Sequence, residues 1–208
     1  MTAKVFLGGE GKNDIGTRGQ IPMGDQPGVV EVLLRKVRAN GWQVTGAMPW
    51  QAIRKYRAGF AKNHAEHADE HNVRALVQRA YEETCEMLAF VRDVDGEQPR
   101  AEAIRRVLEE LDLDEWAAEY GYTLAVAGGV AEPTLEAWIL HLHGITNTDA
   151  MSKAAAARKL TELGLELKSS ADYLAIAEAC DSLPSGAGSL CEWLDRAGQV
   201  FARLIDGT

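Results

Sequence analysis

The chain has 208 residues, of which 46% are hydrophobic and 25% are charged, so it is large and apolar enough to form a folded core. No apolar run reaches the roughly 18 residues that a membrane helix needs, and the first residues lack a signal-peptide layout. We therefore expect no membrane partner. Three scattered cysteines form no C-x-x-C pair, which argues against a disulfide framework and favours a cytoplasmic location.

Charge is distributed unevenly along the chain. The net charge of −9 argues against a surface that is basic throughout, as many nucleic-acid-binding proteins have. Residues 35–80, however, contain nine lysines and arginines and only three acids, a local charge of +6. Two interpretations of this segment stay open, namely a solvated basic helix face and a stripe that grips phosphates.

Short apolar strands alternate with amphipathic helices over the first two thirds of the chain. Strands are recognised by their apolar runs and helices by apolar residues spaced three and four apart. The predicted elements, in chain order, are a strand at 3–7, a helix that starts at Pro27 and stops at Asn40-Gly41, a strand at 42–45, a helix over 73–81, a strand at 87–91, a helix that starts at Pro99, a strand at 122–126 closed by Gly128-Gly129, and a helix with Pro133 in its first turn.

This alternation predicts an α/β fold with a mostly parallel, Rossmann-like sheet and helices on both faces. We expect the core to occupy residues 1–145, with a basic insertion around residues 47–70. Only helical patterns remain after about residue 146, so residues 146–208 are predicted to form a helical extension. The last helix of this extension is apolar enough to pack on the core or on a second subunit.

Acidic residues follow three of the predicted strands. Ligands of open α/β sheets gather beyond the carboxyl ends of the strands, so these acids are candidates for one site. Residues i and i+2 of an extended segment point the same way, and we therefore expect Asp93 and Asp95 to face that site together. The acids are Glu10 and Asp14 after the first strand, Asp93 and Asp95 after the third, and Glu132 and Glu136 after the fourth.

Carboxylates that converge on one sheet edge repel each other. Two like charges ~4 Å apart cost about 4 kcal/mol at an effective dielectric constant of about 20. Either some of the acids are protonated or a divalent cation lies among them, and hard oxygen ligands favour Mg²⁺ or Mn²⁺. Mg²⁺ held by a few carboxylates suits phosphoryl-transfer chemistry. We expect the glycines at 8, 9, 11 and 96 to leave room for a bulky substrate beside the ion.

The order of these motifs resembles the Toprim domain superfamily. The sequence E-G-x-x-D at 10–14 follows a strand, and much later an apolar strand ends in D-V-D-G at 93–96. The first motif is similar to that of overcoming-lysogeny-defect nucleases, and E-P-T-L-E-A-W at 132–138 resembles the helix start of stand-alone bacterial Toprim-like proteins. The resemblance covers roughly residues 3–142. The segment between the two motifs is longer and more basic than a minimal Toprim fold requires.

The resemblance implies a Toprim-like fold and a Mg²⁺-dependent nuclease that hydrolyses phosphodiester bonds of DNA or RNA. It implies Glu10, Asp93 and Asp95 as catalytic residues, with Glu10 as a metal ligand or a general acid or base. The implied ligands of Mg²⁺ or Mn²⁺ are Glu10, Asp14, Asp93, Asp95 and Glu136. Proteins of this kind often act beside an ATPase in antiviral defence or repair, and because this chain has no Walker motif, that ATPase would be a separate subunit.

Four basic residues are candidates for holding the nucleic-acid backbone near the acidic pocket. Acids that bind metal, combined with bases that bind phosphate, form the pattern that a nuclease needs. The candidates are Arg54, Lys55, Arg57 and Lys62.

Other functions compete with the nuclease hypothesis. An apolar strand that ends in D-x-D-G also begins the motif of haloacid-dehalogenase-like phosphatases, in which Asp93 would be the nucleophile. Against that hypothesis, the motif comes late in the chain and no G-D-x-x-x-D follows it. A D-x-D glycosyltransferase is a further alternative. An alternative of a different class is a non-catalytic Toprim-like module that binds a partner, or a second copy of itself, through the C-terminal helices.

Overall fold

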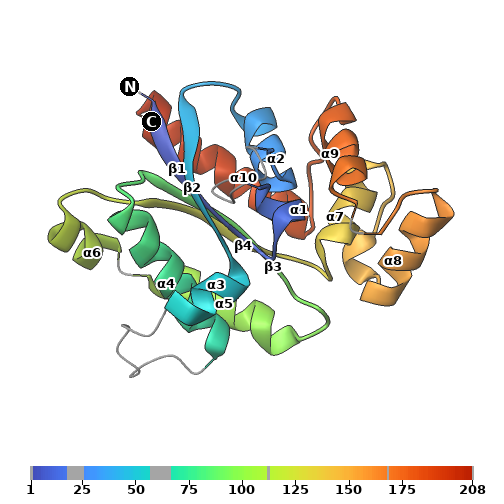
Figure 1. Cartoon of the computed structure of the whole chain (residues 1–208), viewed down its shortest axis with the longest axis horizontal. Helices are drawn as coiled ribbons and strands as arrows, with labels where there is room; N and C mark the ends of the chain where they lie inside the picture. The colour runs from blue at the N-terminus through green and yellow to red at the C-terminus, as the bar shows by residue number, and fades with distance from the viewer. Residues whose placement is uncertain (1, 18–25, 57–66, 112, 168, 208) are drawn as a thin grey trace.

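The protein is described here from a computed structural model, which defines residues 2–17, 26–56, 67–111, 113–167 and 169–207. Four strands in these ranges form one sheet, and every neighbouring pair is parallel (Figure 1). Their order across the sheet is β2-β1-β3-β4. The strands are β1 (Ala3–Gly9), β2 (Trp42–Pro49), β3 (Met87–Asp93) and β4 (Ala125–Ala131).

Helices cover both faces of the sheet, which confirms the predicted α/β class with a parallel, Rossmann-like sheet (Figure 1). None of the helices in the described ranges is long and apolar enough to cross a membrane. One face carries α2 (Val29–Val37), α7 (Leu135–Leu142), α8 (Lys153–Glu162), α9 (Ser170–Ala179) and α10 (Ser189–Phe201). The other carries α3 (Trp50–Tyr56), α4 (Ala68–Glu82), α5 (Gln98–Glu110) and α6 (Leu113–Tyr120). Shorter elements are α1 (Lys12–Ile15), η2 (Thr148–Ala150) and η3 (Ala202–Asp206).

The two central strands are buried on both faces, which explains why their sequences are continuous apolar runs. In β1, Val5 and Leu7 point to the face that α2 and α10 cover, whereas Phe6 points to the face of α4. In β3, Ala89 points to the face of α2 and α10, and Phe90 points to the face of α4. The alternation of side chains along a strand thus supplies one apolar surface to each layer of helices.

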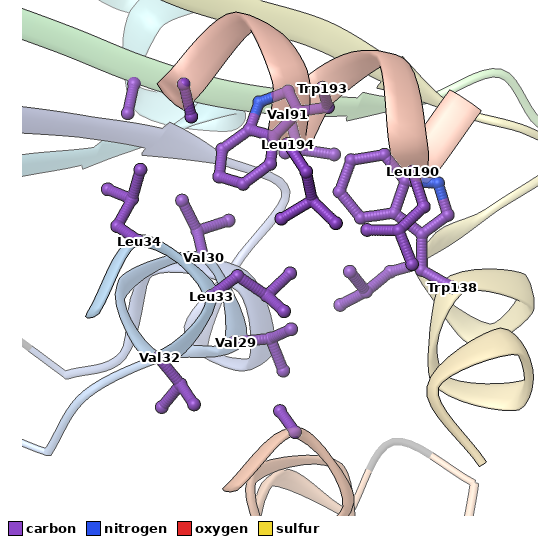
Figure 2. Packing of buried hydrophobic residues seen from close by; sticks show 14 of the residues in the cluster. Val29, Val30, Val32, Leu33, Leu34, Val91, Trp138, Leu190, Trp193 and Leu194 are labelled. Atoms are coloured by element: carbon purple, nitrogen blue, oxygen red, sulfur yellow. The ribbon is translucent and has the colours of Figure 1, made fainter. Parts of the chain in front are cut away.

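The last helix, α10, packs on the core. Figure 2 shows Leu190, Trp193 and Leu194 of α10 lying over the side chains of α2 and beside Trp138 of α7. The rings of Trp138 and Trp193 are 5.7 Å apart, and the Trp193 Nε1–H donates a 3.0 Å hydrogen bond to the Phe90 carbonyl of β3. This apolar helix thus packs on the core of its own chain.

The fourth strand differs from its prediction. The prediction of a strand at 122–126 that ends before the glycine pair is wrong, because β4 starts at Ala125 and runs through both glycines. The aromatic ring of Tyr122 instead packs on Tyr81, with ring centroids 5.2 Å apart. A Cβ at Gly128 would lie 2.2 Å from the Phe90 ring. Glycine is therefore required inside this strand because the Phe90 ring crosses the backbone there.

The start of α7 also differs from its prediction. Pro133 does not lie in the first turn, because α7 begins at Leu135. Thr134 is the N-cap residue of the helix. The proline instead lies in the turn that leads from β4 to the helix.

Candidate functional site

The carboxyl ends of β1 and β3 form a topological switch point at the centre of the sheet. The two strands are adjacent and parallel, so both chains leave the sheet at the same edge. The chain after β1 continues into α2 on one face, whereas the chain after β3 continues into α5 on the other. Connections that diverge in this way open a crevice between the strand ends, where α/β proteins bind ligands.

Asp14 is held at this crevice by the turn after β1. It lies on α1, is only 5% exposed, and accepts a hydrogen bond from the backbone N–H of Glu10 to its Oδ2. Glycine at position 9 leaves room for the Asp14 side chain, since a Cβ at residue 9 would lie 2.6 Å from the Asp14 Cβ. The glycine that ends β1 therefore seats a buried carboxylate against the strand.

The glycines near the site have two different roles. The space beside Gly8 and Gly9 is filled by the protein itself, because a Cβ at Gly8 would lie 2.9 Å from Leu76. The expectation that these two glycines make room for substrate is therefore wrong. Gly11 and Gly96 differ, since a Cβ at either would have no atom within 4 Å.

Three carboxylates from separate elements act on one another at the crevice. Burial, with a contribution from the charge of Glu136, raises the pKa of Asp14 from 3.8 to about 7. Burial and the charges of Asp14 and Glu136 raise the pKa of Asp93 to about 8. The structure thus brings together predicted site residues from α1, the end of β3 and the first turn of α7. We call Asp14, Asp93 and Glu136 the acid cluster.

Hydrogen bonds orient two members of the acid cluster. The backbone N–H of Leu135 donates to Asp93 Oδ1 at 2.8 Å, and the Tyr173 hydroxyl donates to Glu136 Oε1 at 3.1 Å. The second oxygen of each of these carboxylates has no hydrogen-bond partner in the described ranges. One oxygen of each group is thus fixed by the protein, which is how carboxylate ligands of metals are usually oriented.

Asp95 is placed differently from its prediction. The extended strand ends at Asp93, and Asp95 has a left-handed backbone with φ 57°, so the alternation of an extended chain does not align the two side chains. The Asp95 carboxylate lies 2.5 Å from Lys153 Nζ and 3.2 Å from Arg100 Nη1. Burial acts to raise the pKa of Asp95, but the hydrogen bond and charge of Lys153 and the charge of Arg100 together hold it below its ordinary value.

Glu10 also lies at this edge, where it forms an ion pair with Arg92 of β3. The Arg92 side chain is almost completely buried and lies over the Trp50 ring, 5.2 Å from its centroid. Burial and the charge of Arg100 lower the pKa of Arg92 to about 10. The structure therefore places Glu10 next to a buried cation.

A buried aspartate, Asp69 of α4, ties these arginines to the strand ends. It is 3% exposed and accepts hydrogen bonds from Trp50 Nε1 at 2.9 Å and Arg100 Nε at 3.0 Å. Its Oδ1 lies 3.6 Å from Arg92 Nε. Arg100 in turn donates 3.1 Å hydrogen bonds to the carbonyls of Asp93 and Val94. This Asp69 network fixes the backbone that carries the predicted catalytic acids.

The remaining predicted residues divide between the site and other positions. Arg54 and Lys55 are exposed on α3, which follows β2 at the same edge of the sheet. Glu132 forms an ion pair with Arg105 of α5. Two candidates for phosphate binding, Arg57 and Lys62, lie outside the described residues.

No sequence pattern predicted the basic side chains and the aspartate that surround the acids. They come from β3, α4, α5 and α8, and no short motif links them. An arginine between apolar Val91 and the acid at 93 was the one available indication of a buried cation. The missed residues are Asp69, Arg92, Arg100 and Lys153.

The acid cluster is not a preformed coordination sphere. Among the described residues, no group of three His, Cys, Asp or Glu side chains is arranged to hold a metal ion. The donor chemistry nevertheless fits a hard cation, because all three groups offer carboxylate oxygens and their charges act on one another. Comparisons of the chain with models of protein families, with curated proteins and with solved structures found no match. The Toprim resemblance thus stays a prediction.

Proposed function

We propose that this protein is a Mg²⁺- or Mn²⁺-dependent nuclease that hydrolyses phosphodiester bonds of DNA or RNA. The observation that supports the proposal best is the meeting of Asp14, Asp93 and Glu136 at the switch point. None of the three forms an ion pair with a basic side chain in the described ranges. Burial, together with the charges of the acidic neighbours, raises the pKa values of Asp14 and Asp93, so a cation would be needed to keep these groups ionised at neutral pH. A divalent cation is the partner that such a cluster favours.

In this proposal the acid cluster supplies the inner metal ligands. Glu10 and Asp95, which pair with Arg92 and Lys153, flank the cluster and would complete the predicted set of ligands. The bound ion supplies charge for the phosphate oxygens and lowers the pKa of a water molecule. The Asp69 network would hold the end of β3, and with it Asp93, in place beside the ion.

Basic residues around the site supply the phosphate contacts of the proposed reaction. Lys153 lies at the start of α8 with its ammonium group at the Asp95 carboxylate. Arg54 and Lys55 are exposed on α3 at the same sheet edge, where they are placed to contact the backbone of a bound strand. The Toprim resemblance supports a role in antiviral defence or repair beside a separate ATPase subunit.

The proposal is tested by metal-dependent cleavage. Supercoiled plasmid, single-stranded DNA and single-stranded RNA are incubated with the full chain and Mg²⁺, Mn²⁺ or a chelator. We expect cleavage with either metal and none with the chelator. Asp93→Asn keeps the shape of the side chain, and we expect it to reduce the rate by more than about 100-fold, since even supporting residues of metal sites contribute about 10- to 100-fold.

The matched control is Asp181→Asn, which removes an exposed carboxylate in the segment between α9 and α10. We expect this variant to cleave at the wild-type rate. Equal activity of the wild type and Asp93→Asn contradicts the proposal. Turnover of a small phosphomonoester without cleavage of nucleic acid favours the phosphatase alternative. Absence of any turnover favours the non-catalytic, partner-binding alternative.

A further inference from the structure

Among the described residues no further strand pairs with the outer edge of β4, where Val126 is partly exposed and Gly128 and Val130 are buried. β4 is the last strand in the sheet order, and Ala125 and Ala131 direct their backbone groups toward the β3 side. Since backbone groups alternate along a strand, Val126, Gly128 and Val130 direct theirs outward. No backbone group of the described residues pairs with these three outward N–H groups. Such an edge is a template for another strand.

A cavity of about 710 Å³ lies against the first part of this edge, at Ala125 and Val126, between α5 and the end of α10. Its volume lies within the range of roughly 300–1,000 Å³ that ligand sites have. We call it the edge groove. On the α5 side it is lined by Leu108 and Leu111, followed by Leu113 at the start of α6. On the α10 side it is lined by Arg196 and, beyond that helix, Arg203.

One side chain closes the strand edge in the free protein. Arg196 Nη1 donates a 2.6 Å hydrogen bond to the outward carbonyl of Gly128. A strand that pairs with β4 takes this carbonyl for its own N–H, and the guanidinium then needs a new acceptor. Arg196 and Arg203 form no ion pair with any described acid. An acidic side chain on the incoming strand is the acceptor that these two cations favour.

We propose that the edge groove binds an extended segment of a partner protein, which adds a strand to β4. The segment alternates apolar and acidic residues, because successive side chains of a strand point to opposite faces. Its apolar side chains face the leucines of the α5 wall and its acidic side chains face Arg196 and Arg203. Glu109 of α5 and Glu192 of α10 also line the groove, so the acids of the segment are restricted to the part of the α10 wall at Arg196 and Arg203.

A single segment fits the groove better than a second copy of this chain. The edge of β4 is recessed between α5 and α10, since the cavity is lined by both helices and by the strand. In a symmetric pairing of two β4 edges, α5 and α10 of both copies would have to meet before the strands do. Main-chain hydrogen bonds supply the affinity of such strand addition, and the flanking walls select the side chains.

The test selects binders from a library of random heptapeptides displayed on phage, with the full chain as target. We expect the selected peptides to alternate apolar and acidic residues. Each selected peptide is then synthesised in two forms, N-methylated at either the odd or the even amides. Only one set of amides faces β4, so we expect one form to lose binding and the other to retain it. This comparison leaves the protein unchanged.

Protein variants test the walls of the groove. We expect Arg203→Glu to weaken the acidic peptides by at least about 5-fold, the amount of one favourable exposed ion pair. Arg158→Glu makes the same charge change on an exposed position of α8 outside the groove, and we expect it to leave binding unchanged. Selection of no peptides, equal binding of the two N-methylated forms, or equal effects of the two charge reversals overturns the proposal. So does a dimer that forms through β4 and excludes the peptides.

Discussion

Asp93→Asn is expected to stabilise the metal-free protein at alkaline pH. The substitution keeps the size of the side chain and the oxygen that accepts the Leu135 N–H, and it removes a charge from the acid cluster. The folded protein raises the pKa of this carboxyl from 3.8 to about 8. At any pH between these values the unfolded chain releases the proton and the folded chain keeps it, so stability falls as pH rises.

The size of the effect follows from the pKa shift. Each pKa unit corresponds to about 1.36 kcal/mol, so the whole shift of Asp93 corresponds to about 6 kcal/mol above pH 8. Asp14 and Glu136 share the repulsion, and the wild type relieves part of it by protonating Asp14 instead. We therefore expect the substitution to add about 2 to 3 kcal/mol to the free energy of unfolding at pH 8. Near pH 4 we expect almost no difference.

The assay is urea unfolding in a chelator at several values between pH 4 and pH 8. The free energies of unfolding of wild type and variant are compared at each pH. For the control Asp181→Asn, an exposed position, we expect a change of no more than about 0.5 kcal/mol at every pH. A stabilisation that does not grow with pH, or a loss of stability at pH 8, would refute the conclusion that burial and acidic neighbours raise the pKa of Asp93.

Three further substitutions test how the site is built. Asp69→Asn removes the carboxylate between Arg92 and Arg100. We expect the free energy of unfolding in urea to fall by about 3 kcal/mol, and a fall below about 1 kcal/mol would contradict the Asp69 network. Gly128→Ala places a methyl group against the Phe90 ring and should lower the free energy of unfolding by about 1 to 3 kcal/mol. In the control Gly11→Ala the added methyl group meets no atom, and stability should change by at most about 0.5 kcal/mol. Equal shifts of the two melting temperatures would contradict the contact between Gly128 and the Phe90 ring. Ser189→Ala leaves the Trp138 N–H and the backbone N–H of residue 132 without their acceptor, and a loss of about 1 to 3 kcal/mol is expected; an unchanged midpoint of thermal unfolding would contradict it.

Local patterns predicted the sheet and the elements that cover it. The apolar runs at 3–7 and 87–91 are the central strands, since buried parallel strands need no alternation with polar residues. The strand at 122–126 was misplaced because Tyr122 is as typical of a strand as the residues that follow it. Its ring packs in the aromatic cluster around Tyr81 instead. The strand continues through Gly128, where the Phe90 ring leaves no room for a Cβ.

The acids of the site were predictable from strand ends, but their partners were not. Asp14 and Asp93 follow adjacent parallel strands, so topology alone brings them to one edge. The lysine at Asp95 comes from α8, 58 residues later in the chain. Asp69 meets Arg100 across 31 residues in the same way. Contacts between distant segments depend on how helices pack, and no spacing within a motif encodes them.

The most direct test of the proposed metal site is a crystal structure of the wild-type chain with Mn²⁺ and anomalous diffraction data. We expect an anomalous peak between Asp14, Asp93 and Glu136, with carboxylate oxygens at about 2.0 to 2.2 Å, as for ions of this size. We expect the peak to disappear from crystals of Asp93→Asn grown under the same conditions. An ordered crevice in which the three side chains bind no ion at millimolar Mn²⁺, or a peak that persists in the variant, would contradict the account.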